Sequence, residues 1–124
     1  MALITLDPKK VRSFVPERDR KNIVDPLIVK LRYMPNWDYK EHINAMMKDV
    51  GKATDEAKRD EVYRAYDLKM FKDYVEGFEN WTDETGKPLT DVEEFYRSND
   101  KALIYEINSA IMDSQMLTEG QRKN

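Results

Sequence analysis

The sequence predicts a mainly helical α+β fold in one domain, residues 1–124, with an extended segment over 1–35 and a helical body over 36–124. The chain has 124 residues, of which 40% are hydrophobic, enough for one modest core. Four of the five prolines stand in the first 35 residues, among short apolar runs, and helical periodicity begins after them. The expected elements are a short N-terminal β element around 3–33 and about four helices at roughly 36–50, 54–77, 90–98 and 100–117.

The N-terminal segment contains one convincing strand pattern. Residues 26–33 are rich in β-branched side chains and alternate near their end, which predicts a strand. Leu3–Leu6 and Val11–Val15 are weaker candidates to pair with it. Two strands alone would be marginally stable, so we expect helices to pack against this element.

The first two helices are bounded by residues that commonly start and end helices. Asn36 is of a type favoured at helix N-caps, and Gly51 follows the last apolar position of the first helix. The second helix is expected to begin near Thr54 and to end at Gly77, which stands where a C-terminal cap would be. At 1.5 Å per residue this helix would be roughly 35 Å long.

The second helix carries apolar side chains over more than half of its circumference. Such a wide band indicates burial on two sides, either at the centre of the fold or against a partner. Its members are Val62, Tyr63, Tyr66, Leu68, Met70, Phe71, Tyr74, Val75 and Phe78.

Residues 83–88 predict a tight turn, because Gly86 can adopt a positive φ and Pro88 prevents the preceding structure from continuing. Thr90 and Glu93 then fit a capping box that opens a short helix. We expect that helix to end around 98–99, with Ser98 or Asn99 capping the last helix.

The last helix shows two apolar faces. Tyr105, Met112 and Met116 cluster opposite the main stripe, and a helix that serves a single core does not need this second cluster. The first interpretation is that the N-terminal strands cover this cluster. The second is that it forms a binding face, because methionine adapts to irregular apolar partners. The main stripe consists of Leu103, Ile107, Ala110, Ile111, Ser114 and Leu117, with Ile104 widening it.

No catalytic or metal site is expected. The chain contains no cysteine and only one histidine, His42, so a nucleophile and base cannot be paired. Residues 83–87 contain acids near a glycine but lack the oxygen ligands of a calcium loop. Phosphate-binding glycine motifs and zinc-ligand spacings are absent from the sequence. We therefore expect no enzyme activity and no cofactor.

The charge balance does not favour nucleic acid as the main partner. The chain has 21 basic and 24 acidic residues and a net charge of -3, without a long block of either sign. The richest basic segment, Lys9–Lys21, is interrupted by acids. No secretory signal pattern or long apolar stretch is present, so we expect a cytoplasmic protein that does not enter a membrane.

The C-terminal half resembles the tail assembly chaperones of long-tailed bacteriophages and prophages. The resemblance rests on the order of an aromatic segment over 75–81, the turn and following residues over 83–90, the helix over 103–111, and the closing Leu117-Thr118-Glu119 and Arg122-Lys123-Asn124. A looser match lies upstream, where Leu31-Arg32-Tyr33 leads into a helix. Gly120 and Gln121 depart from the pattern and weaken the final helical turn.

The resemblance implies a mainly helical, non-enzymatic protein that acts in the host cytoplasm. It would bind the tape measure protein, keep that long chain soluble and help to recruit tail tube subunits. Such proteins often exist as a short form and a longer frameshifted form, and this chain would correspond to the short form. Self-association remains open.

The sequence therefore leads to one main hypothesis about the binding surface and one alternative function. The client surface is placed on Tyr105, Met112 and Met116, with help from the aromatic side of the second helix. The alternative is a small phage or bacterial regulator that binds DNA or a host protein through the Lys9–Lys21 segment. The residues expected to contribute from the second helix are Tyr66, Tyr74 and Phe78.

Overall fold

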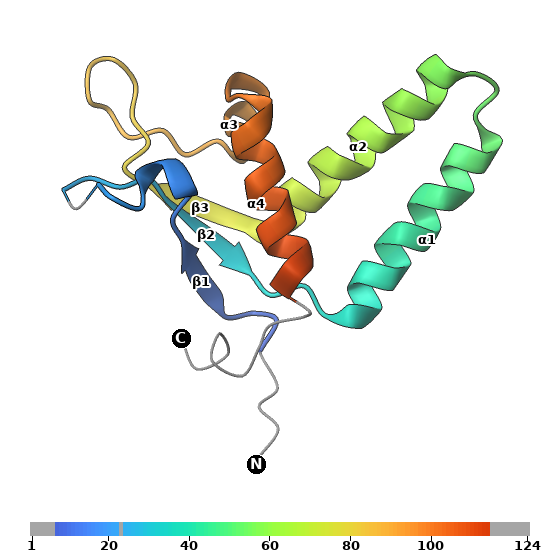
Figure 1. Cartoon of the computed structure of the whole chain (residues 1–124), viewed down its shortest axis with the longest axis horizontal. Helices are drawn as coiled ribbons and strands as arrows, with labels where there is room; N and C mark the ends of the chain where they lie inside the picture. The colour runs from blue at the N-terminus through green and yellow to red at the C-terminus, as the bar shows by residue number, and fades with distance from the viewer. Residues whose placement is uncertain (1–6, 23, 115–124) are drawn as a thin grey trace, which may run out of the picture.

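The fold combines a small antiparallel sheet with four helices, as the sequence predicts (Figure 1). The computed structural model describes residues 7–22 and 24–114. A helical hairpin extends to one side of a body formed by the sheet and the two C-terminal helices. Along the chain the elements are β1 (Val11–Phe14), the 3-10 helix η1 (Glu17–Asp19), β2 (Ile28–Arg32), α1 (Asn36–Lys52), α2 (Glu56–Tyr74), β3 (Val75–Glu79), α3 (Val92–Ser98) and α4 (Lys101–Asp113).

The three strands are antiparallel and β2 is the central one. On one side β2 pairs with β1, with Phe14 opposite Val29. On the other side it pairs with β3, with Val29 opposite Phe78. The strand predicted over 26–33 and the weaker candidate at Val11–Val15 are therefore confirmed. The candidate at Leu3–Leu6 lies outside the described residues.

The prediction of one helix over 54–77 is wrong at its C-terminal end. Helix α2 stops at Tyr74, and β3 begins at the next residue. Val75 is buried, and the paired strand gains backbone hydrogen bonds to β2 that a longer helix would lose. Gly77 lies inside β3 and does not cap the helix. Asn80, the residue after the strand, has a positive φ of 64°, and its side chain donates a 2.7 Å hydrogen bond to the carbonyl of Pro26.

Aspartates cap three of the four helices, each close to the position expected from the sequence. Asp55 caps α2 instead of Thr54, and Asp91 caps α3 one residue after Thr90. Asp100 caps α4 in place of Ser98 or Asn99. A carboxylate accepts the free N–H groups of the first turn and also faces the positive end of the helix dipole.

Helix α1 begins without a capping side chain, unlike the other three helices. Asn36 is the first residue of α1 and Pro35 stands at the N-cap, without a side-chain cap hydrogen bond. The helix also continues through Gly51 to Lys52. Helix α4 is described to Asp113, so the expected extension to residue 117 lies outside the described residues.

The turn predicted over 83–88 is present and is closed by Asp83. Its carboxylate accepts hydrogen bonds from the backbone N–H groups of Thr85, at 2.8 Å, and Lys87, at 3.1 Å. The Thr85 hydroxyl and these N–H groups lower the pKa of Asp83. Gly86 has a φ of 86°, which confirms its expected role. The acidic residue here serves the turn itself.

The core lies between the sheet and α4, with α3 and the C-terminal half of α2 closing it. Leu103, Ile107 and Ile111 of the main stripe of α4 are buried as predicted, whereas Leu117 lies outside the described residues. Phe95 of α3 stacks on Phe78 of β3, with ring centroids 4.1 Å apart. The other buried apolar residues are Val29, Leu31, Met34, Met70, Phe71, Val75 and Ile104.

Helix η1 is tied to α4 by charged groups from the basic segment. The Arg18 guanidinium donates two hydrogen bonds of 2.8 Å to the Asp100 carboxylate. Arg20 lies 3.7 Å from Glu106, which also accepts a 2.9 Å hydrogen bond from the backbone N–H of Glu17. Two arginines of the Lys9–Lys21 segment are thus engaged within the protein.

The ion pair between Arg18 and Asp100 predicts that the folding stability depends on pH. Arg18, followed by the backbone N–H of Leu103, holds the pKa of Asp100 well below its usual range. A lowered folded-state pKa stabilises the fold above the unfolded value of about 3.9, and this contribution disappears as the pH falls through the folded-state pKa. The variant Asp100→Asn keeps a capping side chain but removes the charge, so it should be less stable at neutral pH.

Urea unfolding of both proteins across acidic pH checks this prediction. The stability difference between wild type and Asp100→Asn should shrink as the pH falls below about 4. Arg18→Gln should remove the same contribution, and the double variant should lose little more than either single variant. A difference that does not change with pH would contradict the account.

Candidate binding cleft

Helices α1 and α2 form an antiparallel hairpin that projects from the body (Figure 1). Although α1 has 17 residues, all of them described, none is buried. It packs chiefly on α2, where the Tyr66 hydroxyl donates a hydrogen bond to Asp49 and the Tyr66 ring meets His42 edge to face at 5.6 Å. Only the C-terminal half of α2, with Met70 and Phe71, enters the core. The hairpin therefore leaves much of its apolar surface outside the core.

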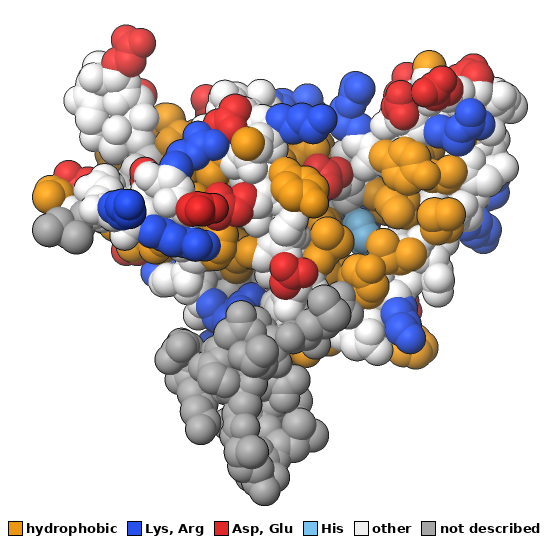
Figure 2. Space-filling view, in the orientation of Figure 1, with side chains coloured by type: hydrophobic (Ala, Val, Ile, Leu, Met, Phe, Trp, Pro, Cys, Tyr) orange, Lys and Arg blue, Asp and Glu red, His pale blue; other side chains and the backbone are white. Residues whose placement is uncertain are grey.

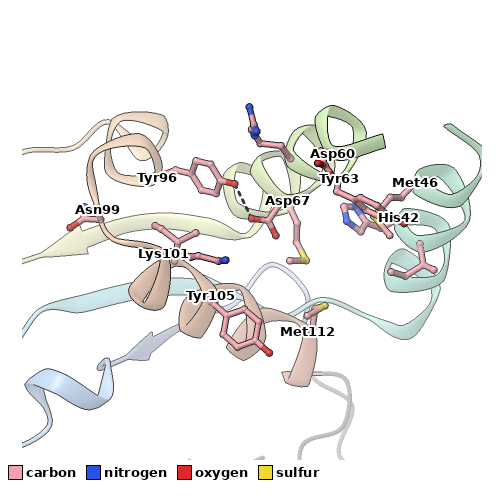
Figure 3. A pocket seen from close by; sticks show the side chains of 14 residues that line it. His42, Met46, Asp60, Tyr63, Asp67, Tyr96, Asn99, Lys101, Tyr105 and Met112 are labelled. Atoms are coloured by element: carbon pink, nitrogen blue, oxygen red, sulfur yellow. Dashed lines mark hydrogen bonds between the residues drawn. The ribbon is translucent and has the colours of Figure 1, made fainter. Parts of the chain in front are cut away.

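A cleft of about 720 Å³ lies between this hairpin and α4. Figure 2 shows hydrophobic side chains gathered around the His42 ring, between the hairpin and the body. Figure 3 shows side chains from α1, α2 and α4 around the opening, with Tyr105 and Met112 on α4. The lining residues are His42, Ile43 and Met46 of α1, Asp60, Tyr63, Arg64, Asp67 and Met70 of α2, Tyr96 of α3, Asn99, and Lys101, Ile104, Tyr105 and Met112 of α4.

The polar groups in the cleft include a tyrosine–aspartate hydrogen bond and one histidine. The Tyr96 hydroxyl donates a 2.8 Å hydrogen bond to the Asp67 carboxylate (Figure 3). Burial, together with this hydrogen bond, raises the pKa of Tyr96 to about 12, so the phenol stays protonated at neutral pH. Burial and the nearby Lys69 lower the pKa of His42, so its imidazole is neutral at pH 7. Charged residues of both signs share the lining with the neutral Tyr96 and His42 side chains.

Two of the three binding residues predicted on the last helix line the cleft, and the third lies outside the described residues. Tyr105 is 71% exposed and Met112 is half-buried, and both line the cleft. The described N-terminal strands therefore leave Tyr105 uncovered. Met112 also packs partly against the core. Met116 lies outside the described residues.

The aromatic residues predicted on the second helix lie elsewhere. Tyr66 is half-buried between α1 and α2, and Phe78 belongs to β3 and stacks on Phe95 of the core. Tyr74 lies beside Arg32, whose guanidinium carbon is 5.7 Å from the ring centroid, and burial raises the Tyr74 pKa to about 12. Tyr66 and Tyr74 line a smaller hollow of about 270 Å³ near the base of the hairpin. Of the expected residues that the structure describes, the cleft therefore brings together Tyr105 and Met112.

The hairpin supplies cleft residues that the sequence did not single out as a site, above all Ile43, Met46 and Tyr63. Their helical spacing in the sequence predicts one apolar face on each helix. The spacing alone does not show whether that face packs against the core or stays exposed to solvent. Tyr63 is 44% exposed, so in the structure this side is only partly covered.

No match to this chain was found among protein-family models, curated proteins or solved structures. Within residues 7–22 and 24–114, no cluster of three or more histidine, aspartate or glutamate side chains could hold a metal ion. In the same part of the chain, no helix has the length and apolar character needed to cross a membrane.

Proposed function

We propose that the protein is a non-enzymatic tail assembly chaperone of a long-tailed bacteriophage or prophage. It binds the tape measure protein in the host cytoplasm, keeps that chain soluble and helps to recruit tail tube subunits. The observation that carries the proposal is the cleft of about 720 Å³ between the α1–α2 hairpin and α4. A chaperone needs an apolar surface that its own core does not occupy, and the cleft provides one.

The composition of the cleft suits a helical client. Met46, Met70 and Met112 come from three different helices, and their unbranched side chains adapt to irregular apolar surfaces. Along α4 the lining extends from Lys101 to Met112, a rise of roughly 16 Å, which is three turns of helix. An amphipathic helix placed in a groove of this length would bury its apolar side.

The resemblance of residues 75–124 to tail assembly chaperones supports the identity of the client. This region contains α4, which forms one wall of the cleft. A tape measure protein is expected to be long, amphipathic and prone to aggregate. A small protein with an open groove can cover the apolar face of one client helix at a time.

Co-expression with the tape measure protein of the same genome tests this proposal. We expect a several-fold increase in the soluble yield of that protein and its co-purification with the chaperone. The gene order should also show an overlapping downstream frame followed by a very long helical gene. An unchanged soluble yield together with no co-purification would refute the proposal.

A further inference from the structure

The charged residues of the cleft are ordered along its length. Helix α2 contributes Asp60, Arg64 and Asp67 to the lining, and α4 contributes its first residue, Lys101. Residues three, four and seven apart on a helix share one side, so the three residues of α2 form a row along the cleft. Asp60 and Asp67 lie roughly 10 Å apart along this row, at 1.5 Å per residue. The row runs from the hairpin toward the body.

The end of the row nearest the body carries one more positive than negative charge. The Asp67 carboxylate there accepts the 2.8 Å hydrogen bond from Tyr96 of α3. Burial raises the pKa of Tyr96, and the nearby positive charge of Arg64 opposes this rise. Figure 3 shows Lys101 on the same side of the opening as Tyr96 and Asp67, with Asp60 farther along α2. The cleft therefore has a positive body end, at Lys101, and a negative hairpin end, at Asp60.

These charges are available to an occupant of the cleft. Asp60, Arg64 and Lys101 form no ion pair with any residue of 7–22 and 24–114. Apolar side chains such as Met46 of α1 and Ile104 of α4 share the lining with them. A helix that buries its apolar face here would bring its own charged flanks beside both ends.

We infer that the client helix carries one acidic and one basic residue about seven positions apart beside its apolar face, and that these charges fix its direction in the cleft. The acidic residue lies at the body end beside Lys101, and the basic residue lies at the hairpin end beside Asp60. The inference rests on the proposed function and adds which helices are selected and how they are oriented. A uniformly acidic or uniformly basic helix would place like charges together at one end.

Binding of synthetic helical peptides to the full chain tests the inference. The peptides share an apolar face of leucine over roughly five turns and differ only at two flanking positions about seven residues apart. These positions hold glutamate and lysine in the mixed peptide, glutamate twice in the acidic peptide, lysine twice in the basic peptide and glutamine twice in the neutral peptide. Titration calorimetry at physiological ionic strength measures Kd for the wild type, Asp60→Lys, Lys101→Glu and the double variant.

Glu61→Lys is the matched control for Asp60→Lys. Glu61 is an exposed carboxylate at the next position of α2, but it does not line the cleft. Both substitutions change the net charge of the protein equally. Asp60, Glu61 and Lys101 are all exposed, so each variant should melt close to the wild-type temperature.

We expect the wild type to bind the mixed peptide about threefold or more tightly than any of the other peptides. Lys101→Glu should prefer the basic peptide and Asp60→Lys the acidic peptide, because each variant has the same sign of charge at both ends. The double variant should again prefer the mixed peptide, bound in the opposite direction. A photoreactive group at the acidic end of that peptide should crosslink to the body in the wild type and to the hairpin in the double variant.

The possible contrary results are distinct. If all peptides bind the wild type equally, or if Glu61→Lys alters the order of preference as Asp60→Lys does, the inference is wrong while the proposed function stands. If no peptide binds, the cleft is not a helix-binding site, and both fail. If sedimentation shows a dimer that the peptides do not displace, a second copy of this chain occupies the cleft instead, and the inference also fails.

Discussion

Replacing Phe95 by alanine is expected to lower the free energy of unfolding by about 3–5 kcal/mol, a large part of the stability of a domain of this size. Phe95 is 1% exposed and lies at the centre of an aromatic cluster. Its ring stacks on Phe78 at 4.1 Å and lies 5.0 Å from Trp81 and 6.0 Å from Phe71. Phe78 belongs to β3, Trp81 to the segment after it and Phe71 to α2. A cavity at Phe95 therefore loosens the packing of α3 against all three.

Urea unfolding followed by tryptophan fluorescence measures this loss, since Trp81 contacts the Phe95 ring. Tyr105→Ala is the matched control, because Tyr105 is also an aromatic residue of a C-terminal helix but is 71% exposed. Its stability should change by no more than about 0.5 kcal/mol. A loss of less than about 1 kcal/mol for Phe95→Ala would show that the aromatic cluster is not the centre of the core.

Replacing Tyr105 by glutamate is expected to weaken capture of the tape measure protein by about 2 kcal/mol or more, roughly 30-fold in Kd. The tyrosine ring stands at the mouth of the cleft, and a carboxylate there would have to be desolvated against apolar side chains. The melting temperature should remain close to that of the wild type because the side chain is 71% exposed.

Trp37→Glu provides a closely matched comparison. Trp37 is also 71% exposed and also lies on a helix, α1, but it does not line the cleft. Both variants replace one large, exposed aromatic side chain with glutamate, so the main difference between them is their position. Equal loss of client capture in the two variants would mean that exposed aromatic surface in general, and not the cleft, holds the client. Met112 is less suitable for this test, because it packs partly against the core.

Local patterns predicted the elements of the fold well where a single feature determines them. The β-branched run before Tyr33 became β2, and the apolar stripe of α4 became one side of the core. Gly86 adopts the positive φ that its turn requires. In each case the relevant interaction lies within a few residues or follows directly from side-chain periodicity.

Features that depend on distant partners were missed. Val75–Glu79 reads as the end of a helix and becomes a strand because β2, more than forty residues earlier, offers a free edge. Because β3 pairs with β2, Phe78 lies in a strand and not on the apolar face of the second helix, where it was expected. Capping residues shifted by one position because neighbouring serine, threonine, asparagine and aspartate compete for the same role.

The cleft shows a similar limit. The sequence singled out a second face on the last helix, of which Tyr105 and Met112 line the cleft. It could not show that α1 packs chiefly on α2 and contributes no buried residue to the core. That arrangement depends on the direction in which the hairpin leaves the body, and hydrophobic periodicity carries no information about direction.

Site-specific photo-crosslinking is the most direct test of the central claim that the cleft holds the client. A photoreactive phenylalanine analogue is placed at Tyr105, or at Trp37 as the control, in protein co-expressed with the tape measure protein. Crosslinks to one side of amphipathic helices in the tape measure protein from position 105, and few or none from position 37, are the predicted result. Equal crosslinking from both positions, or none from position 105 in a complex that still co-purifies, would contradict the claim.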